Sequence, residues 1–221
     1  AEKACGNDLG GIKSKSTRSK PEAVKSQVIT IPDELLQVNE EITLSIDGLN
    51  VNGLEFLTTI SHDLYYRSAA RIMSTGHKPV YQRIQEIYLL YKRYGFHVTE
   101  IRSDKQFKKA LEMFRDDQLQ KYQTVVKINI ANTKEHVPHA ERNNRTIQDR
   151  TRCDYVNMPY THLPRTLVEY MVMESSKKLN FFPASHGISK HYSPRMIVHK
   201  ENIDFDTHCV YAIGEYVQGE H

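Results

Sequence analysis

Apolar and polar residues alternate strictly over residues 41–47, which is typical of a strand with one covered face. Asn52-Gly53 is a strong signal for a type I′ turn, so a second strand is predicted over residues 54–61. A third strand is predicted near residues 64–66. Together these segments indicate an antiparallel meander at the start of the periodic part of the chain.

Helices and strands are expected to alternate after this meander. Apolar residues recur at helical spacing between Pro79, which suits a first helical turn, and Gly95, which ends helices. The later pattern predicts an extended run over residues 96–103, a helix near 107–114, a strand near 126–130, a polar helix from Pro138 to about Arg152, and a helix from Pro164 to about Leu179. This order is a mixed α/β layout.

Three parts of the chain differ in composition. Residues 1–40 are a basic lead-in, residues 41–180 hold the pattern of a folded core, and residues 181–221 are an irregular extension rich in His, Pro and Tyr. The lead-in is typical of a solvated arm, or of an arm that follows a phosphate backbone. The first residue is Ala rather than Met, so a fragment or a processed piece is expected.

Composition narrows the class of protein. Hydrophobic residues make up 39% of the chain and charged residues 26%, as in soluble globular proteins. No apolar run approaches membrane-spanning length, and no signal peptide is evident. Cys5, Cys153 and Cys209 are odd in number and far apart, which argues for free thiols. A net charge of +3 is too small to establish nucleic-acid binding.

Three carboxylates occupy the ends of predicted elements. Asp47 ends the first strand, Asp104 lies where a strand gives way to a helix, and Glu141 lies in the first turn of the Pro138 helix. If they converge at one edge of a sheet, their oxygens suit hard divalent cations. Two such ions can activate a water or a 3′-hydroxyl and stabilise the leaving oxygen.

Each carboxylate also has a structural interpretation, which taken singly is the more common one. Glu141 can pair with Arg145 one turn later, or interact with the N-terminal end of its helix. Asp104 is a good helix N-cap, and Asp47 can be a turn residue before Gly48. Only their joint placement favours a catalytic site.

Other residues give weaker signals. His136 and His139 suggest zinc, but Pro138 lies between them and no further ligand is evident. His199 and the pair His208-Cys209 are equally unsupported, and nothing nearby activates the thiol. The basic residues of the polar helix fit either a solvated face or phosphate contacts; they are Arg142, Arg145, Arg150 and Arg152.

Several segments carry a resemblance to a known family. Residues 135–147 contain Pro-His-Ala-Glu-Arg-Asn-Asn-Arg-Thr-Ile, which is similar to the strand-transfer helix of copia-type retrotransposon integrases. Residues 95–104 resemble the run into the second catalytic acid of that family, and Asp47 with residues 51–61 resembles the first acid and its hairpin. Ser193-Pro194-Arg195 also matches, so the similarity extends over nearly the whole chain.

The resemblance implies a ribonuclease H-like fold, with a mixed central sheet flanked by helices. It implies catalytic and metal-binding roles for Asp47, Asp104 and Glu141, two Mg²⁺ or Mn²⁺ ions, and DNA 3′-end processing and strand transfer. The expected partners are element ends, target DNA and further copies of the chain, with no membrane, in the nucleus after a cytoplasmic particle stage. The expected DNA contacts are Arg142, Asn144, Arg145 and Gln148.

The chain departs from the family in two places. Lys105-Gln106-Phe107 stands where many relatives have Gly and Glu, and the upstream zinc-binding His-His-Cys-Cys module is missing. An alternative is therefore a catalytically inactive nucleic-acid-binding or multimerisation module with the same fold.

Overall fold

The computed structural model describes residues 31–32, 40–74, 76–122, 125–131, 137–201 and 203. Most of the basic lead-in, Cys5, His136, His208 and Cys209 lie outside the described residues, and Cys153 is buried with a free thiol. Among the described helices, none is both long and apolar enough to span a bilayer.

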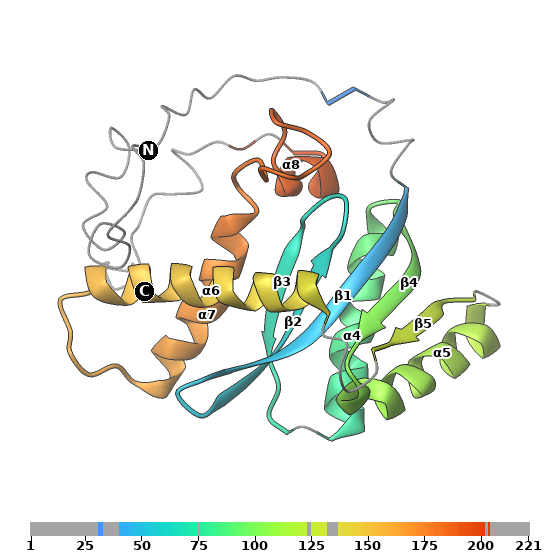
Figure 1. The fold of residues 1–221 in the computed structure, drawn as a ribbon, viewed down its shortest axis with the longest axis horizontal. Coiled ribbons are helices and arrows are strands. Elements are labelled where there is room, and N and C mark those ends of the chain that lie inside the picture. Colours follow the sequence, from blue (N-terminus) through green and yellow to red (C-terminus); the bar gives the residue numbers. More distant parts are fainter. Residues whose placement is uncertain are drawn as a thin grey trace, which may run out of the picture.

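The centre of the protein is a five-stranded sheet in the order β3-β2-β1-β4-β5 (Figure 1). The strands are β1 (Glu41–Val51), β2 (Leu54–Ser61), β3 (Arg67–Arg71), β4 (His97–Ser103) and β5 (Lys127–Ile130). The first three are antiparallel, whereas β4 and β5 run parallel to β1. The mixed α/β class and the strand order expected of a ribonuclease H-like fold are therefore confirmed.

The hairpin between β1 and β2 forms as its turn signal predicts. Asn52 and Gly53 have φ angles of 51° and 74°, and a type I′ turn needs both to be positive. The predicted third strand was placed wrongly, because β3 begins only at Arg67. Tyr65 adopts a left-handed φ of 56°, which breaks the extended backbone within the residues that were expected to form the strand.

Within the described ranges, six helical segments surround the sheet. They are α4 (His77–Arg93), η1 (Lys105–Phe107), α5 (Lys108–Tyr122), α6 (Pro138–Asn157), α7 (Arg165–Leu179) and α8 (Pro194–His199). The helix α6 continues beyond the predicted end at Arg152, and α8 was not predicted. Ser193 caps α8 by accepting a hydrogen bond from the Met196 amide, and Pro194 occupies its first turn.

Two hydrophobic cores lie on the two faces of the sheet. One packs β1 and β4 against residues of α4, α5 and α8 and is the larger. The other joins Leu49 and Phe56 of the β1–β2 hairpin to Ile147 of α6 and to Val168 and Val172 of α7. In Figure 1, α6 lies in front of the sheet and of α7. The second core therefore fixes the position of α6 on the sheet.

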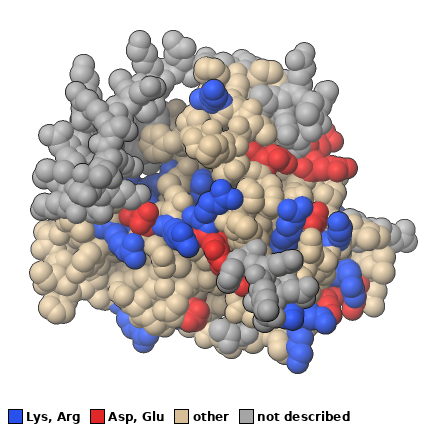
Figure 2. Space-filling view, in the orientation of Figure 1, with Lys and Arg blue, Asp and Glu red and all other residues tan. Residues whose placement is uncertain are grey.

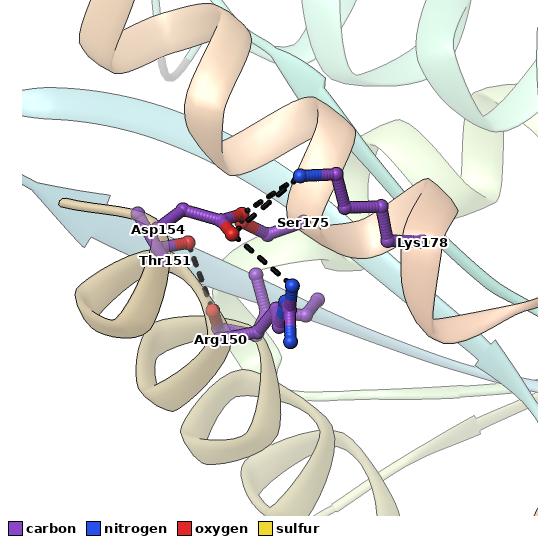
Figure 3. A network of polar contacts seen from close by, with 6 residues as sticks. Arg150, Thr151, Asp154, Ser175 and Lys178 are labelled. Carbon is purple, nitrogen blue, oxygen red and sulfur yellow. Dashed lines mark hydrogen bonds and ion pairs between the residues drawn. The ribbon is translucent and has the colours of Figure 1, made fainter. Parts of the chain in front are cut away.

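A buried carboxylate joins α6 to α7 (Figure 3). Asp154 is 7% exposed and accepts a hydrogen bond from the Ser175 hydroxyl at 3.0 Å. It also forms ion pairs with Arg150 at 3.2 Å and with Lys178 at 3.5 Å. Because a buried charge is costly without such partners, this network ties the two helices together.

Candidate active site

The parallel pairing of β1 with β4 brings two of the predicted acids to one edge. Ile46 lies opposite Ser103 in the register of the two strands. Asp47 follows Ile46 and Asp104 follows Ser103, so the two acids lie next to each other at this point of the parallel pair. Side chains alternate along a strand, so both acids lie on the face opposite the buried Ile46.

Asp47 is a strand residue with both carboxylate oxygens engaged. It pairs with Thr58 of β2, and β1 continues for four more residues to Val51, so the interpretation of Asp47 as a turn residue is wrong. Its Oδ1 accepts a hydrogen bond from the Gly48 amide at 2.7 Å. Its Oδ2 accepts one from Asn144 Nδ2 at 2.8 Å.

Asp104 occupies the N-cap position of η1, but its side chain makes no capping hydrogen bond. Structural capping therefore does not account for this carboxylate. The backbone of β1 approaches the same segment closely, since a Cβ added to Gly48 would lie 3.4 Å from Gln106 and 3.6 Å from Phe107. Gln106 and Phe107 therefore pack directly beside Gly48, the residue after Asp47.

The third acid, Glu141, lies in the first turn of α6, which is linked to β1 through Asn144. The Asn144 amide donates to Asp47 Oδ2 and to the Gly48 carbonyl at 3.0 Å. Its oxygen accepts a hydrogen bond from the Thr58 hydroxyl at 2.6 Å. Because Asn144 is three residues after Glu141, both lie on neighbouring parts of the helix surface.

The pKa of Asp47 is affected by the charges of the other two acids. Burial raises the pKa of Asp47 to about 6, the Gly48 hydrogen bond opposes this, and the charges of Asp104 and Glu141 raise the pKa further. Like charges that repel in this way are relieved by a divalent cation. All three side chains are partly exposed, so an ion can reach them.

The acids do not form a closed metal site. Within the described part of the chain, no group of three or more His, Cys, Asp or Glu side chains is close enough to hold an ion. The donor chemistry fits Mg²⁺ or Mn²⁺, which prefer carboxylate oxygens. The catalytic and metal-binding roles of Asp47, Asp104 and Glu141 stay predictions.

The four predicted DNA contacts differ in their surroundings. Arg142 and Arg145 are exposed on α6, and Gln148 is partly exposed. Asn144, in contrast, uses its amide within the protein, as described above. Figure 2 shows basic patches interrupted by acidic ones on the face along which α6 runs. Direct DNA contacts by Arg142, Arg145 and Gln148 stay predictions, whereas the Asn144 amide is bonded to Asp47 and Gly48 and orients the Asp47 carboxylate.

Two histidines join the start of α6 to the sheet. The ring of His139 stacks on that of His62, with centroids 4.2 Å apart and planes at 26°. His62 Nε2 lies 2.7 Å from the Ser45 hydroxyl. Burial, followed by the charges of His139 and Arg102, lowers the pKa of His62 to about 4. Burial also lowers the pKa of His139, so both rings are neutral at pH 7.

His199 is within hydrogen-bonding distance of two tyrosine hydroxyls. His199, at the end of α8, lies 2.9 Å from the Tyr94 hydroxyl and 3.1 Å from the Tyr66 hydroxyl. These contacts give His199 a structural role between α8, α4 and the segment before β3.

Replacing Asn144 with Ala should test its role as a positioning residue. The loss of hydrogen bonds to Asp47, Gly48 and Thr58 should lower the free energy of unfolding by about 1–2 kcal/mol and should leave DNA affinity unchanged. A pure DNA contact would instead weaken DNA affinity and leave stability unchanged. Thermal unfolding and DNA binding of Asn144→Ala, with Gln148→Ala as the control on the same helix, separate these outcomes.

Acidification should destabilise the protein through His62. The pKa of this group falls from 6.5 to about 4 on folding, so the unfolded chain binds the extra proton between these values. The stability is therefore complete above pH 6.5 and is lost as the pH falls toward 4. Urea unfolding at about pH 8 and about pH 5 should show a larger loss in the wild type than in His62→Gln. The raised pKa of Asp47 has the opposite effect in both proteins, so equal losses would contradict the role of His62.

No protein-family model matches the chain, and a comparison with curated proteins finds no similar sequence. The structure is similar to the catalytic core domain of BIV integrase, with a TM-score of 0.48 and 17% sequence identity. The alignment covers 72% of this chain and 93% of that chain. At this level of similarity the comparison assigns no chemistry to the site, which is therefore argued from the side chains of this chain alone.

Two residues of the site carry no signal in the sequence. Thr58 reaches Asn144 because β2 pairs with β1, and His62 reaches His139 because α6 crosses the end of β2. Neither contact follows from spacing along the chain, since each joins residues far apart in sequence.

Proposed function

We propose that this chain is the catalytic core of a copia-type retrotransposon integrase, which processes DNA 3′ ends and transfers them to target DNA. The observation that carries the proposal is the geometry around Asp47, which lies next to Asp104 in the parallel register of β1 and β4 and accepts a hydrogen bond from Asn144 of α6 at 2.8 Å. It supports a common site for three acids that come from β1, the end of β4 and the start of α6. The sequence around Glu141, Glu-Arg-Asn-Asn-Arg-Thr, supports the same assignment.

Asp47, Asp104 and Glu141 would hold two Mg²⁺ or Mn²⁺ ions, which lower the pKa of an attacking water or 3′-hydroxyl and stabilise the leaving oxygen. The chain contributes orientation to this chemistry. Asn144 fixes one oxygen of Asp47, and Thr58 fixes Asn144. The exposed Arg142 and Arg145 would bind DNA phosphates in any sequence, as backbone contacts do.

The proposed function also implies which partners the chain binds and where the reaction takes place. The DNA partners are the ends of the element and a target duplex, and further copies of this chain would hold the two ends together. The reaction would take place in the nucleus after a cytoplasmic particle stage.

Metal-dependent DNA cleavage tests the proposal directly. The protein is incubated with branched DNA that mimics a strand-transfer product, in Mg²⁺ or Mn²⁺ and with EDTA as the control. Cleavage and rejoining that need the metal support the integrase assignment. DNA binding without any metal-dependent cleavage would instead support the inactive nucleic-acid-binding module.

A further inference from the structure

A cavity of about 210 Å³ lies beside α6, between the β2–β3 connection and the segment that follows α7. Its polar lining consists mainly of Tyr65, Arg67, His139, Arg142, Thr146 and His186. Successive residues of a helix are about 100° apart, so His139 and Glu141 point to different sides of α6. The cavity therefore neighbours the acids but is separate from them.

The lining is rich in positive and hydrogen-bond-donating groups. Two Arg and two His side chains contribute to it, and no described residue of the lining is Asp or Glu. The carboxylate of Asp63, whose charge acts on His139, does not line the cavity. Since one water needs only about 10–15 Å³, the volume admits a tetrahedral oxyanion.

Arg67 is a half-buried cation, and no carboxylate of the described residues forms an ion pair with it. Its Nε is buried with no hydrogen-bond partner, and burial lowers the pKa of the guanidinium. Its Nη1 donates to the Tyr65 carbonyl at 3.2 Å. A half-buried charge in this state is unfavourable until an anion pairs with it.

The surrounding residues hold Arg67 in place despite this cost. The Asn180 side chain accepts from the Arg67 amide at 2.8 Å and donates to the Arg67 carbonyl at 2.7 Å. Tyr65 has a left-handed φ of 56°, and its ring lies 5.9 Å from the guanidinium carbon. Strained and fixed groups of this kind are typical of binding sites that are organised before the ligand arrives.

We propose that this cavity binds a backbone phosphate of a DNA strand, with Arg67 as the deep contact and Arg142 at the entrance. Arg142 is exposed and Arg145 continues the basic surface along α6, so a polyanion can be held at several phosphates. Arg is suited to this task because its planar fork can donate two hydrogen bonds to one phosphate. The inference rests on the proposed function, since DNA is the substrate there.

The test compares Arg67→Gln with the wild type in EDTA, where binding does not depend on the catalytic metal. We expect the affinity for a short duplex to fall about tenfold and the salt dependence to lose about one phosphate contact. Without DNA, Arg67→Gln should be at least as stable as the wild type, because an unpaired half-buried charge has been removed. Arg71→Gln is the matched control on the same strand, since Arg71 pairs with Glu169 and does not line the cavity.

A second variant and a second ligand distinguish the remaining explanations. Arg67→Lys retains the charge without the fork, so its affinity should lie between those of the wild type and Arg67→Gln. Inorganic phosphate is the second probe, read by thermal unfolding. Equal DNA affinity in the wild type and Arg67→Gln would overturn the proposal, and a phosphate effect confined to the wild type would then assign the cavity to free phosphate. Absence of strand transfer would affect only the proposed function.

Discussion

Replacing Asp104 with Asn should abolish metal-dependent DNA cleavage while leaving the fold intact. In the proposed function the substitution would remove a ligand from a two-ion site, and since metal ions supply several kcal/mol of transition-state stabilisation, activity should fall at least about a hundredfold. Folding should change little, because the Asp104 side chain makes no capping hydrogen bond. Stability should even rise slightly, since the charge of Asp104 disfavours the ionised form of Asp47.

The same pattern is expected for Asp47→Asn and Glu141→Gln, although Asp47→Asn also disturbs the hydrogen bond from Asn144. Asp116→Asn is the control, because Asp116 is an exposed acid of α5 that pairs with Arg115. The measurements are cleavage of branched DNA in Mg²⁺ or Mn²⁺ and the melting temperature of each variant. Folded variants with undiminished cleavage would rule out the assignment of these three acids as the catalytic residues.

The largest expected effect on stability comes from Asp154. Replacing it with Ala leaves Arg150 and Lys178 close together without their carboxylate and removes the acceptor of Ser175. Breaking a buried ion pair costs about 3–5 kcal/mol, but each cation is 35% exposed, so we expect about 2–3 kcal/mol. At roughly 2–4 °C per kcal/mol, the melting temperature should fall by about 5–10 °C.

Asp149→Ala is the matched control for this prediction. Asp149 lies on the same helix and pairs with Arg152, but 37% of its side chain is exposed, so its loss should cost less than about 1 kcal/mol. Asp154→Asn should lie between the two, because the amide still accepts from Ser175 but carries no charge. Similar melting temperatures for Asp154→Ala and Asp149→Ala would show that the buried network does not join α6 to α7.

The sequence alone determined the elements whose signals are local. The alternation in β1, the Asn52-Gly53 turn and the apolar period of α4 each reflect backbone preferences within a few residues, and the structure has all three. Pro138 likewise marked the start of α6, because proline suits a first helical turn. The placement of Asp104 before η1 and of Glu141 in the first turn of α6 followed from such boundaries, whereas the expectation that Asp47 ends its strand was wrong, because β1 continues to Val51.

Local signals failed where distant contacts decide the conformation. Arg67 rather than Leu64 begins β3, because pairing with Ile60 and capture of its backbone by Asn180 fix that position. Residues of α8 are buried in the larger core, although the segment is too short to show a period. The contact between Arg67 and Asn180 joins residues 113 positions apart, and no pattern along the chain encodes it.

The functional assignments divide in the same way. The sequence placed Asn144 and Arg142 together as DNA contacts, because both lie on a basic, polar helix. Packing of α6 against β1 turned Asn144 toward Asp47, while Arg142 stayed exposed and lines the cavity with Arg67. Residue types and helix spacing thus identified the candidates, and only the tertiary structure decided which neighbour each one meets, because that depends on how α6 lies across the sheet.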